Sequence, residues 1–154
     1  MYKKILVPID GSAPSQRGLD EAIALARLAQ AELEVLHVID AYPVLPDMAV
    51  LTDLRSLRDE MSRHGQQLLS EAAHKARDAG VTARVRLREI ESGRVAASIL
   101  DTAQEYACDL IVIGTHGRRG FSRLVLGSDA ERVARASSLP VLLVPARQDA
   151  KAGG

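Results

Sequence analysis

The sequence predicts an α/β fold in which one open, mainly parallel sheet of five strands carries helices on both faces. Apolar runs of strand length alternate with longer segments of helical periodicity along the 154 residues. Some runs are apolar throughout, as expected of strands covered on both faces, and another alternates strictly between apolar and polar residues. Such alternation of strands and helices implies parallel strands joined by right-handed crossovers.

The first three expected elements are a strand, a helix and a second strand. Ile5–Ile9 is short and apolar throughout, which predicts a strand covered on both faces. Within Pro14–Gln30, leucine, isoleucine and alanine recur at helical spacing, so one side of this helix should face the core. Leu33–Ile39 is the second strand-like run, and a loop with two prolines follows it.

The middle of the chain predicts a long helix and a strand at an edge of the sheet. Asp53–Ala79 carries leucine, methionine and alanine along one helical face, and Gly80 stands at the expected C-terminal stop. Val81–Arg88 alternates between apolar and polar residues. This alternation indicates a strand with one face in water, which favours an edge position.

Two helix–strand pairs complete the chain. Arg94–Tyr106 has apolar residues on one helical side, and the fully apolar run Leu110–Ile113 predicts the fourth strand. Ala130–Ser137 has a helical pattern, and Val141–Val144, bracketed by prolines, predicts the fifth strand.

These burial patterns predict the strand order 3-2-1-4-5. The first and fourth strands are the most apolar, which favours central positions, and the amphipathic third strand favours an edge. The first and fourth strands then lie side by side, and their connections leave in opposite directions. In open α/β sheets the ligand crevice forms at the carboxyl ends of such a pair, which here lead into Asp10 and Gly114.

Composition excludes several classes of function. Acidic and basic residues balance at 20 each, so no global charge favours nucleic acid or an anionic membrane, and 3% aromatic residues disfavour base-stacking platforms. No apolar segment approaches membrane-spanning length, and the N-terminus lacks a signal-peptide pattern, so we expect a cytoplasmic protein. We expect one domain over residues 1–146 and a loose tail over residues 147–154.

The cysteine and most histidines are interpreted as structural. Cys108, the single cysteine, cannot form an internal disulfide and precedes an apolar strand, which favours a small buried side chain over a redox role. His37, His64 and His74 share no metal-ligand spacing.

A glycine-rich connection joins the fourth strand to the last helix. Gly114 and Gly117 follow the strand, and Gly127 and Ser128 precede the helix. Glycines let an anion approach backbone amides, and a serine at a helix start can hold a phosphate at the positive end of the helix dipole. The same residues also suit a turn-rich connection, since the stretch has neither the Walker A sequence nor the GxGxxG spacing. The residues alone leave the phosphate site and the turn as alternatives.

The connection also carries positive charge. His116, Arg118, Arg119 and Arg123 are candidate phosphate neighbours, although arginines in exposed loops are more often simply solvated. A general-base role for His116 is the weaker alternative, and we expect no catalytic residue.

The sequence resembles the universal stress protein family from Lys3 to Pro145. The resemblance rests on KKILVPIDGS, on VLHVID and on ACDLIVIGTHGRRGFSRLVLGSDAERVARASSLPVLLVP. The last block contains the Gly-x2-Gly-x9-Gly-Ser motif of the nucleotide-binding branch without a missing position. The resemblance implies a Rossmann-like (adenine nucleotide alpha-hydrolase-like) fold with ATP, or another adenine nucleotide, in the crevice.

The resemblance also implies a role for individual residues. Asp10 would meet the ribose or bind through Mg²⁺, Val38 would lie against the adenine, and the glycines with Ser128 would hold the phosphates. The expected nucleotide-binding residues are Pro8, Ile9, Asp10, Val38, Ile113, Gly114, His116, Gly117, Arg118, Gly127, Ser128 and Asp129.

Asp129 departs from the family pattern, because many relatives carry a small or aliphatic residue there. A carboxylate suits the start of a helix but repels a phosphate on the same side. The side chain either faces solvent or helps to hold Mg²⁺.

The expected function is that of a stress-response regulator or sensor, in which bound ATP changes the surface offered to an unknown protein partner. Slow ATP hydrolysis and a nucleotide-free interaction module are the alternatives. The strand Val141–Val144 is apolar and expected at an edge, so pairing with a second copy would cover it, as the resemblance also implies. We therefore expect a homodimer.

Overall fold

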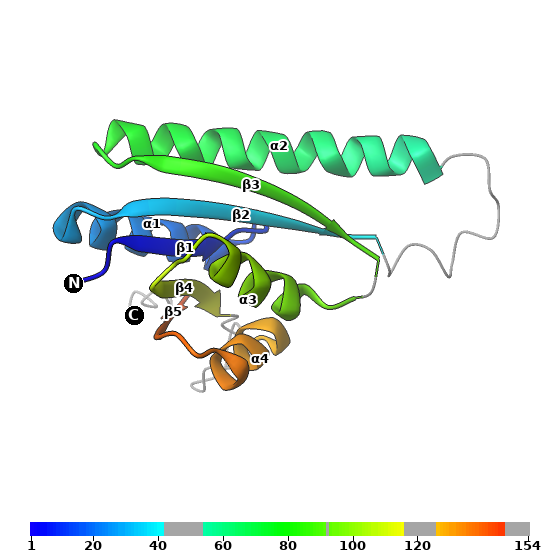
Figure 1. Ribbon diagram of the computed structural model, residues 1–154. Coiled ribbons are helices and arrows are strands. Elements are labelled where there is room, and N and C mark those ends of the chain that lie inside the picture. Colours follow the sequence, from blue (N-terminus) through cyan, green and yellow to red (C-terminus); the bar gives the residue numbers. More distant parts are fainter. Residues whose placement is uncertain (42–53, 92, 116–125, 147–154) are drawn as a thin grey trace, which may run out of the picture.

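The computed structural model describes residues 1–41, 54–91, 93–115 and 126–146 (Figure 1). Strands and helices alternate along the chain as expected. The elements are β1 Lys4–Pro8, α1 Ala13–Ala29, β2 Glu32–Asp40, α2 Leu54–Asp78, β3 Ala83–Ile90, α3 Val95–Glu105, β4 Leu110–Thr115, α4 Ser128–Ala136 and β5 Val141–Pro145. The expected C-terminal tail and the loop that carries most of the expected positive charge lie outside the described residues.

The five strands form one parallel sheet in the order β3-β2-β1-β4-β5, which confirms the predicted topology. The amphipathic strand β3 and the last strand β5 are the two edges. The connections after β1 and β4 lead to helices on opposite faces of the sheet.

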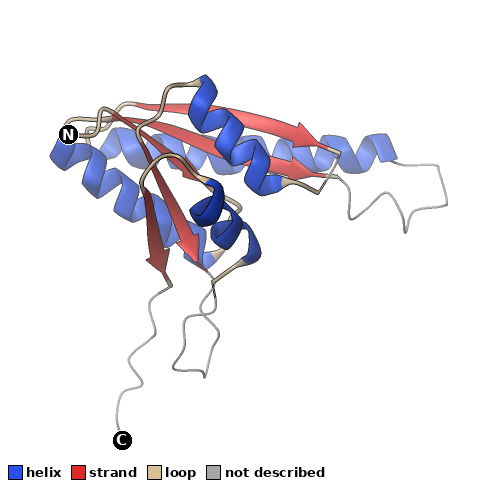
Figure 2. Ribbon diagram, turned by 60° about the horizontal axis from the view of Figure 1, so that its bottom comes forward, coloured by secondary structure: helices blue, strands red, loops and turns tan. Residues whose placement is uncertain are grey.

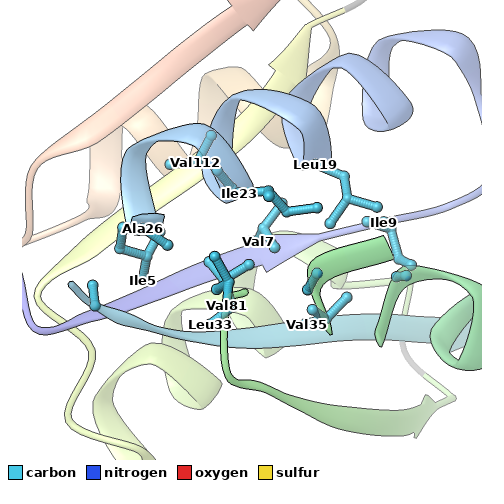
Figure 3. Packing of buried hydrophobic residues seen from close by; sticks show 14 of the residues in the cluster. Ile5, Val7, Ile9, Leu19, Ile23, Ala26, Leu33, Val35, Val81 and Val112 are labelled. Carbon is cyan, nitrogen blue, oxygen red and sulfur yellow. The ribbon is translucent and has the colours of Figure 1, made fainter. Parts of the chain in front are cut away.

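Helices α1 and α2 cover one face of the sheet. Figure 3 shows Leu19, Ile23 and Ala26 of α1 against Ile5 and Val7 of β1. Alternation along β1 places these two residues and Ile9 on this face, and all three are buried. The apolar positions that predicted the helix are therefore the ones that pack on the sheet.

Helices α3 and α4 cover the other face with a second apolar core. Leu6, Leu36, Ile111 and Ile113 point to this side and meet buried residues of both helices, among them the fully buried Val133. Because β1 and β4 contribute to both cores, their buried segments Ile5–Val7 and Leu110–Ile113 are continuous apolar runs.

A shared cap ends α1, α2 and α3, and the cap of α2 accounts for the late start of β3. Gln30, Gly80 and Ala107 lie one or two residues after these helices, and each adopts a left-handed backbone conformation. The amide of the next residue, respectively Ala31, Val81 or Cys108, returns to a carbonyl of the last helical turn. Those three residues are buried, so Val81 belongs to the cap of α2, and β3 begins two residues later than predicted.

A partly buried ion pair ties the edge strand β3 to the sheet. Glu34 of β2 is fully buried and accepts a hydrogen bond from Arg86 Nε at 3.0 Å. The Arg86 guanidinium also stacks on the Tyr106 ring, 4.0 Å from its centroid. This polar contact lies on the face of α3, next to an otherwise apolar core.

Across the described ranges, no helix combines the length and the apolarity that crossing a membrane would require.

Candidate functional site

The pairing between β1 and β4 is unusually short. Only two residue pairs, Ile5 with Leu110 and Leu6 with Ile111, link these strands, whereas β1 pairs with β2 over five residue pairs and β2 with β3 over eight. In Figure 2 the strand that leads to the C-terminus and its neighbour splay away from the two long strands. The sheet therefore opens at the carboxyl ends of β1 and β4, at the predicted crevice.

A cleft of about 640 Å³, counted to its open mouth, lies at this point. Its lining of apolar side chains with a few polar groups is typical of a small-molecule site. The described residues that line it are Pro8, Ile9, Asp10, Ser12, Pro14, Ser15, Val38, Val95, Ile99, Ile113, Gly114, Gly127, Ser128, Asp129 and Ala130.

The structure brings most of the expected site residues together here. Nine of the expected nucleotide-binding residues line the cleft: Pro8, Ile9, Asp10, Val38, Ile113, Gly114, Gly127, Ser128 and Asp129. His116, Gly117 and Arg118 lie outside the described residues, as do Arg119 and Arg123. Nucleotide binding by the expected site residues, inside and outside the described ranges, stays a prediction.

Hydrogen bonds within the β1–α1 turn fix the polar end of the cleft. Asp10 Oδ1 accepts from the Ser12 amide at 2.9 Å, and Ser12 Oγ caps α1 by accepting from the Ser15 amide at 3.3 Å. Ser15 Oγ accepts in turn from the Asp10 amide at 3.2 Å. Gly11 completes the turn with φ of 82°, a conformation that favours glycine. Asp10 therefore has a turn-forming role as well as its place in the cleft.

Sequence reasoning missed Ser12, Pro14 and Ser15 on this wall, and Val95 and Ile99 on the wall formed by α3. The serines carried a signal, because Asp-Gly-Ser after a strand is typical of a turn followed by a helix cap. Val95 and Ile99 carried only the pattern of a core-facing helix. Their place in the cleft depends on how α3 packs.

Gly114 is needed for packing rather than for a turn. It lies within β4, which runs to Thr115 and so beyond the predicted end at Ile113. A Cβ at Gly114 would overlap the Pro14 carbonyl and would lie 2.9 Å from the Ser15 amide nitrogen. Absence of a side chain thus lets the first turn of α1 approach β4 closely.

The start of α4 forms the opposite rim of the cleft. Gly127 is the extended N-cap residue, and Ser128 and Asp129 begin the helix two residues earlier than predicted. The first amides of a helix have no acceptor within the helix, so they can donate to a bound anion. Ser128 is exposed, whereas Asp129 is half-buried.

His37 supports the cleft from the other side of the sheet. The buried ring donates from Nδ1 to the Ile9 carbonyl at 2.8 Å, directly before Asp10. The ring packs under α2 at Gly65, where a Cβ would lie 2.6 Å from the imidazole Cδ2. This contact agrees with the structural role inferred from the sequence.

Cys108 is buried, as predicted, with 5% of its surface exposed. Burial raises the pKa of its thiol to about 11, and the Glu34 carboxylate acts in the same direction. The thiolate is the reactive form of cysteine, so the side chain stays unreactive at neutral pH. A redox role is disfavoured by this environment.

Comparison with known proteins gives the site a family context. Residues 1–145 match the sequence profile described as the universal stress protein family. The chain belongs to the universal stress protein family. The family resemblance read from the sequence is therefore confirmed, over nearly the whole chain.

Relatives within the universal stress protein family match in length as well as in sequence. Universal stress protein YxiE of Bacillus subtilis is 35% identical over 150 residues, which cover 94% of this chain and 99% of that protein. A crystal structure of a family member from Burkholderia pseudomallei is 34% identical, has a TM-score of 0.78 and covers 94% of this chain and 97% of that one.

A universal stress protein solved in complex with cAMP is also similar. It is 28% identical, has a TM-score of 0.63 and covers 95% of this chain and 98% of that one.

Proposed function

We propose that this protein binds an adenine nucleotide in the cleft and acts as a stress-response regulator or sensor through its nucleotide state. The single observation that carries the proposal is the cleft itself, which lies where β1 and β4 separate and α4 begins. A cleft at this switch point is the usual ligand site of an open α/β sheet. The related protein in complex with cAMP supports an adenine nucleotide as the ligand class.

The two ends of the cleft suit the two ends of a nucleotide. Val38, Val95 and Ile99 give one wall an apolar surface for a base. The β1–α1 turn offers Asp10 to ribose hydroxyls, and the first amides of α4 with Ser128 offer donors to a phosphate.

Replacing Val38 with tryptophan should fill the base end of the cleft. We expect the affinity for ATP and for cAMP to fall about tenfold or more, because the indole occupies the space proposed for the adenine. Calorimetric titration measures the effect. Val85→Trp is the matched control, since Val85 lies on β3, is 41% exposed and does not line the cleft. Equal losses in both variants, or no loss at Val38, would contradict this placement of the base.

We also propose that two copies pair through the strand β5. This strand is an edge of the sheet, and its Leu142 and Leu143 are 38% and 37% exposed. Exposed apolar residues on an unpaired edge favour association, and a two-fold axis lets the same strand pair with itself. Sedimentation equilibrium should give the mass of two chains, and Leu142→Glu should shift it toward one chain. A monomeric wild-type protein at micromolar concentration would refute the proposal.

A further inference from the structure

The charged side chains of the cleft are an unexpected feature for a phosphate site. Among the described residues that line it, the ionisable side chains are Asp10 and Asp129, both carboxylates. A nucleotide bound as proposed would bring further negative charge into the same space. Unscreened like charges at close range are unfavourable, and more so in a cleft than in open water.

Asp129 lies on the inward side of α4. It precedes the fully buried Val133 by four residues, so the two share one face of the helix. Its half-buried side chain and its place in the cleft lining agree with this geometry. Asp129 therefore lies in the same helical turn as the amides that are proposed to meet the phosphate, and it lines the cleft.

The donor atoms near these carboxylates fit a magnesium ion that arrives with a nucleotide. Asp10, Ser12, Ser128 and Asp129 offer oxygen atoms, the ligand type that Mg²⁺ prefers. Within the part of the chain that the structure describes, no group of three or more histidine, cysteine, aspartate or glutamate side chains could hold a metal by itself. Mg²⁺ is commonly held by one or two carboxylates together with phosphates, so the site fits Mg²⁺ only as a partner of the nucleotide.

We propose that Asp129 is a specificity determinant that makes the binding of a triphosphate depend on a divalent cation. The inference rests on the proposed nucleotide function of the cleft. Without the cation, Asp129 opposes the many charges of ATP and opposes cAMP, with its one phosphodiester, much less. With Mg²⁺, the phosphate charge is partly neutralised, and Asp129 stands where it adds to the attraction for the cation.

A second role of Asp129 has to be separated from this one. A carboxylate in the first turn of a helix stabilises the helix through its dipole. Glu131 lies in the same first turn but does not line the cleft, and it forms an ion pair with Arg135 at 2.8 Å. Glu131→Gln therefore removes the same charge from the same turn without changing the cleft, which makes it a matched control for Asp129→Asn.

The test is calorimetric titration of the wild type and of these two variants with ATP and with cAMP, in EDTA and in Mg²⁺. For the wild type, Mg²⁺ should raise the affinity for ATP about tenfold or more and leave the affinity for cAMP nearly unchanged. Asp129→Asn should raise the affinity for ATP in EDTA about tenfold and reduce the benefit of Mg²⁺. Glu131→Gln should resemble the wild type in all four titrations.

The titrations distinguish a failure of the Asp129 proposal from a failure of the proposed nucleotide binding. If Asp129→Asn leaves the ratio of the ATP affinities with and without Mg²⁺ unchanged, or if Glu131→Gln alters it equally, the role of Asp129 is refuted while nucleotide binding stands. If neither ATP nor cAMP binds to the wild type under any condition, the proposed function fails and the inference falls with it.

Discussion

Gly114→Ala is expected to destabilise the protein by about 3 kcal/mol, the upper range for overpacking a well-packed interior. The added methyl group would overlap backbone atoms of Pro14, which cannot rotate away as a side chain can. Gly18, one turn further along α1, belongs to the same close approach, because a Cβ there would lie 3.0 Å from the Gly114 amide nitrogen. The first turn of α1 must therefore move off β4. Urea unfolding followed by circular dichroism measures the loss.

Gly80→Ala is the control for this substitution. Nothing lies within 4 Å of the position of its added Cβ, so only the left-handed backbone, with φ of 76°, is strained. That strain costs about 1 kcal/mol. If Gly114→Ala lost no more stability than Gly80→Ala, the close approach of α1 to β4 would be wrong.

Replacing Arg86 with methionine should cost about 3 kcal/mol of folding free energy, because it leaves the buried Glu34 carboxylate without its partner. The other carboxylate oxygen, Oε1, has no hydrogen-bond partner among the described residues, so nothing nearby compensates. The substitution also removes the stacking of the guanidinium on Tyr106. Thermal and urea unfolding should both show the loss.

Two further variants identify the cause of that loss. Glu34→Leu combined with Arg86→Met removes both charges, and it should recover most of the stability, as apolar replacements of buried ion pairs often do. Arg84→Met breaks the exposed pair of Arg84 with Glu32, 3.8 Å apart on the same two strands, and should cost less than about 0.5 kcal/mol. Equal losses from Arg84→Met and Arg86→Met would show that burial of Glu34 is not the cause.

The fold could be predicted from the sequence because its signals are local. The alternation of β3 marked an edge strand, the unbroken apolar run of β4 marked a central one, and their order placed the crevice. Gly80 stopped α2 as expected, since a left-handed residue after a helix is a local requirement.

The features that escaped prediction depend on contacts between distant segments. Glu34 lies 52 residues from Arg86, so no local pattern indicated that this carboxylate would be buried and paired. The packing role of Gly114 had no local signal, because its neighbour Pro14 comes from another element. Ala107 and Gln30 adopt left-handed conformations that glycine usually marks, so the cap they share with Gly80 was invisible.

The short ladder between β1 and β4 has a mechanical consequence. Because β1 and β4 are joined by two residue pairs near their amino ends, the sheet has two parts, β3-β2-β1 and β4-β5, that meet at this short ladder. Beyond this short ladder, α1 links the two parts of the sheet through its close contact at Gly114 and through the apolar core that reaches Val144 of β5. A change in the angle between the two parts would therefore require a shift of α1 and would leave every strand hydrogen bond in place. The width of the cleft is set by packing, which is a softer restraint than a β-ladder.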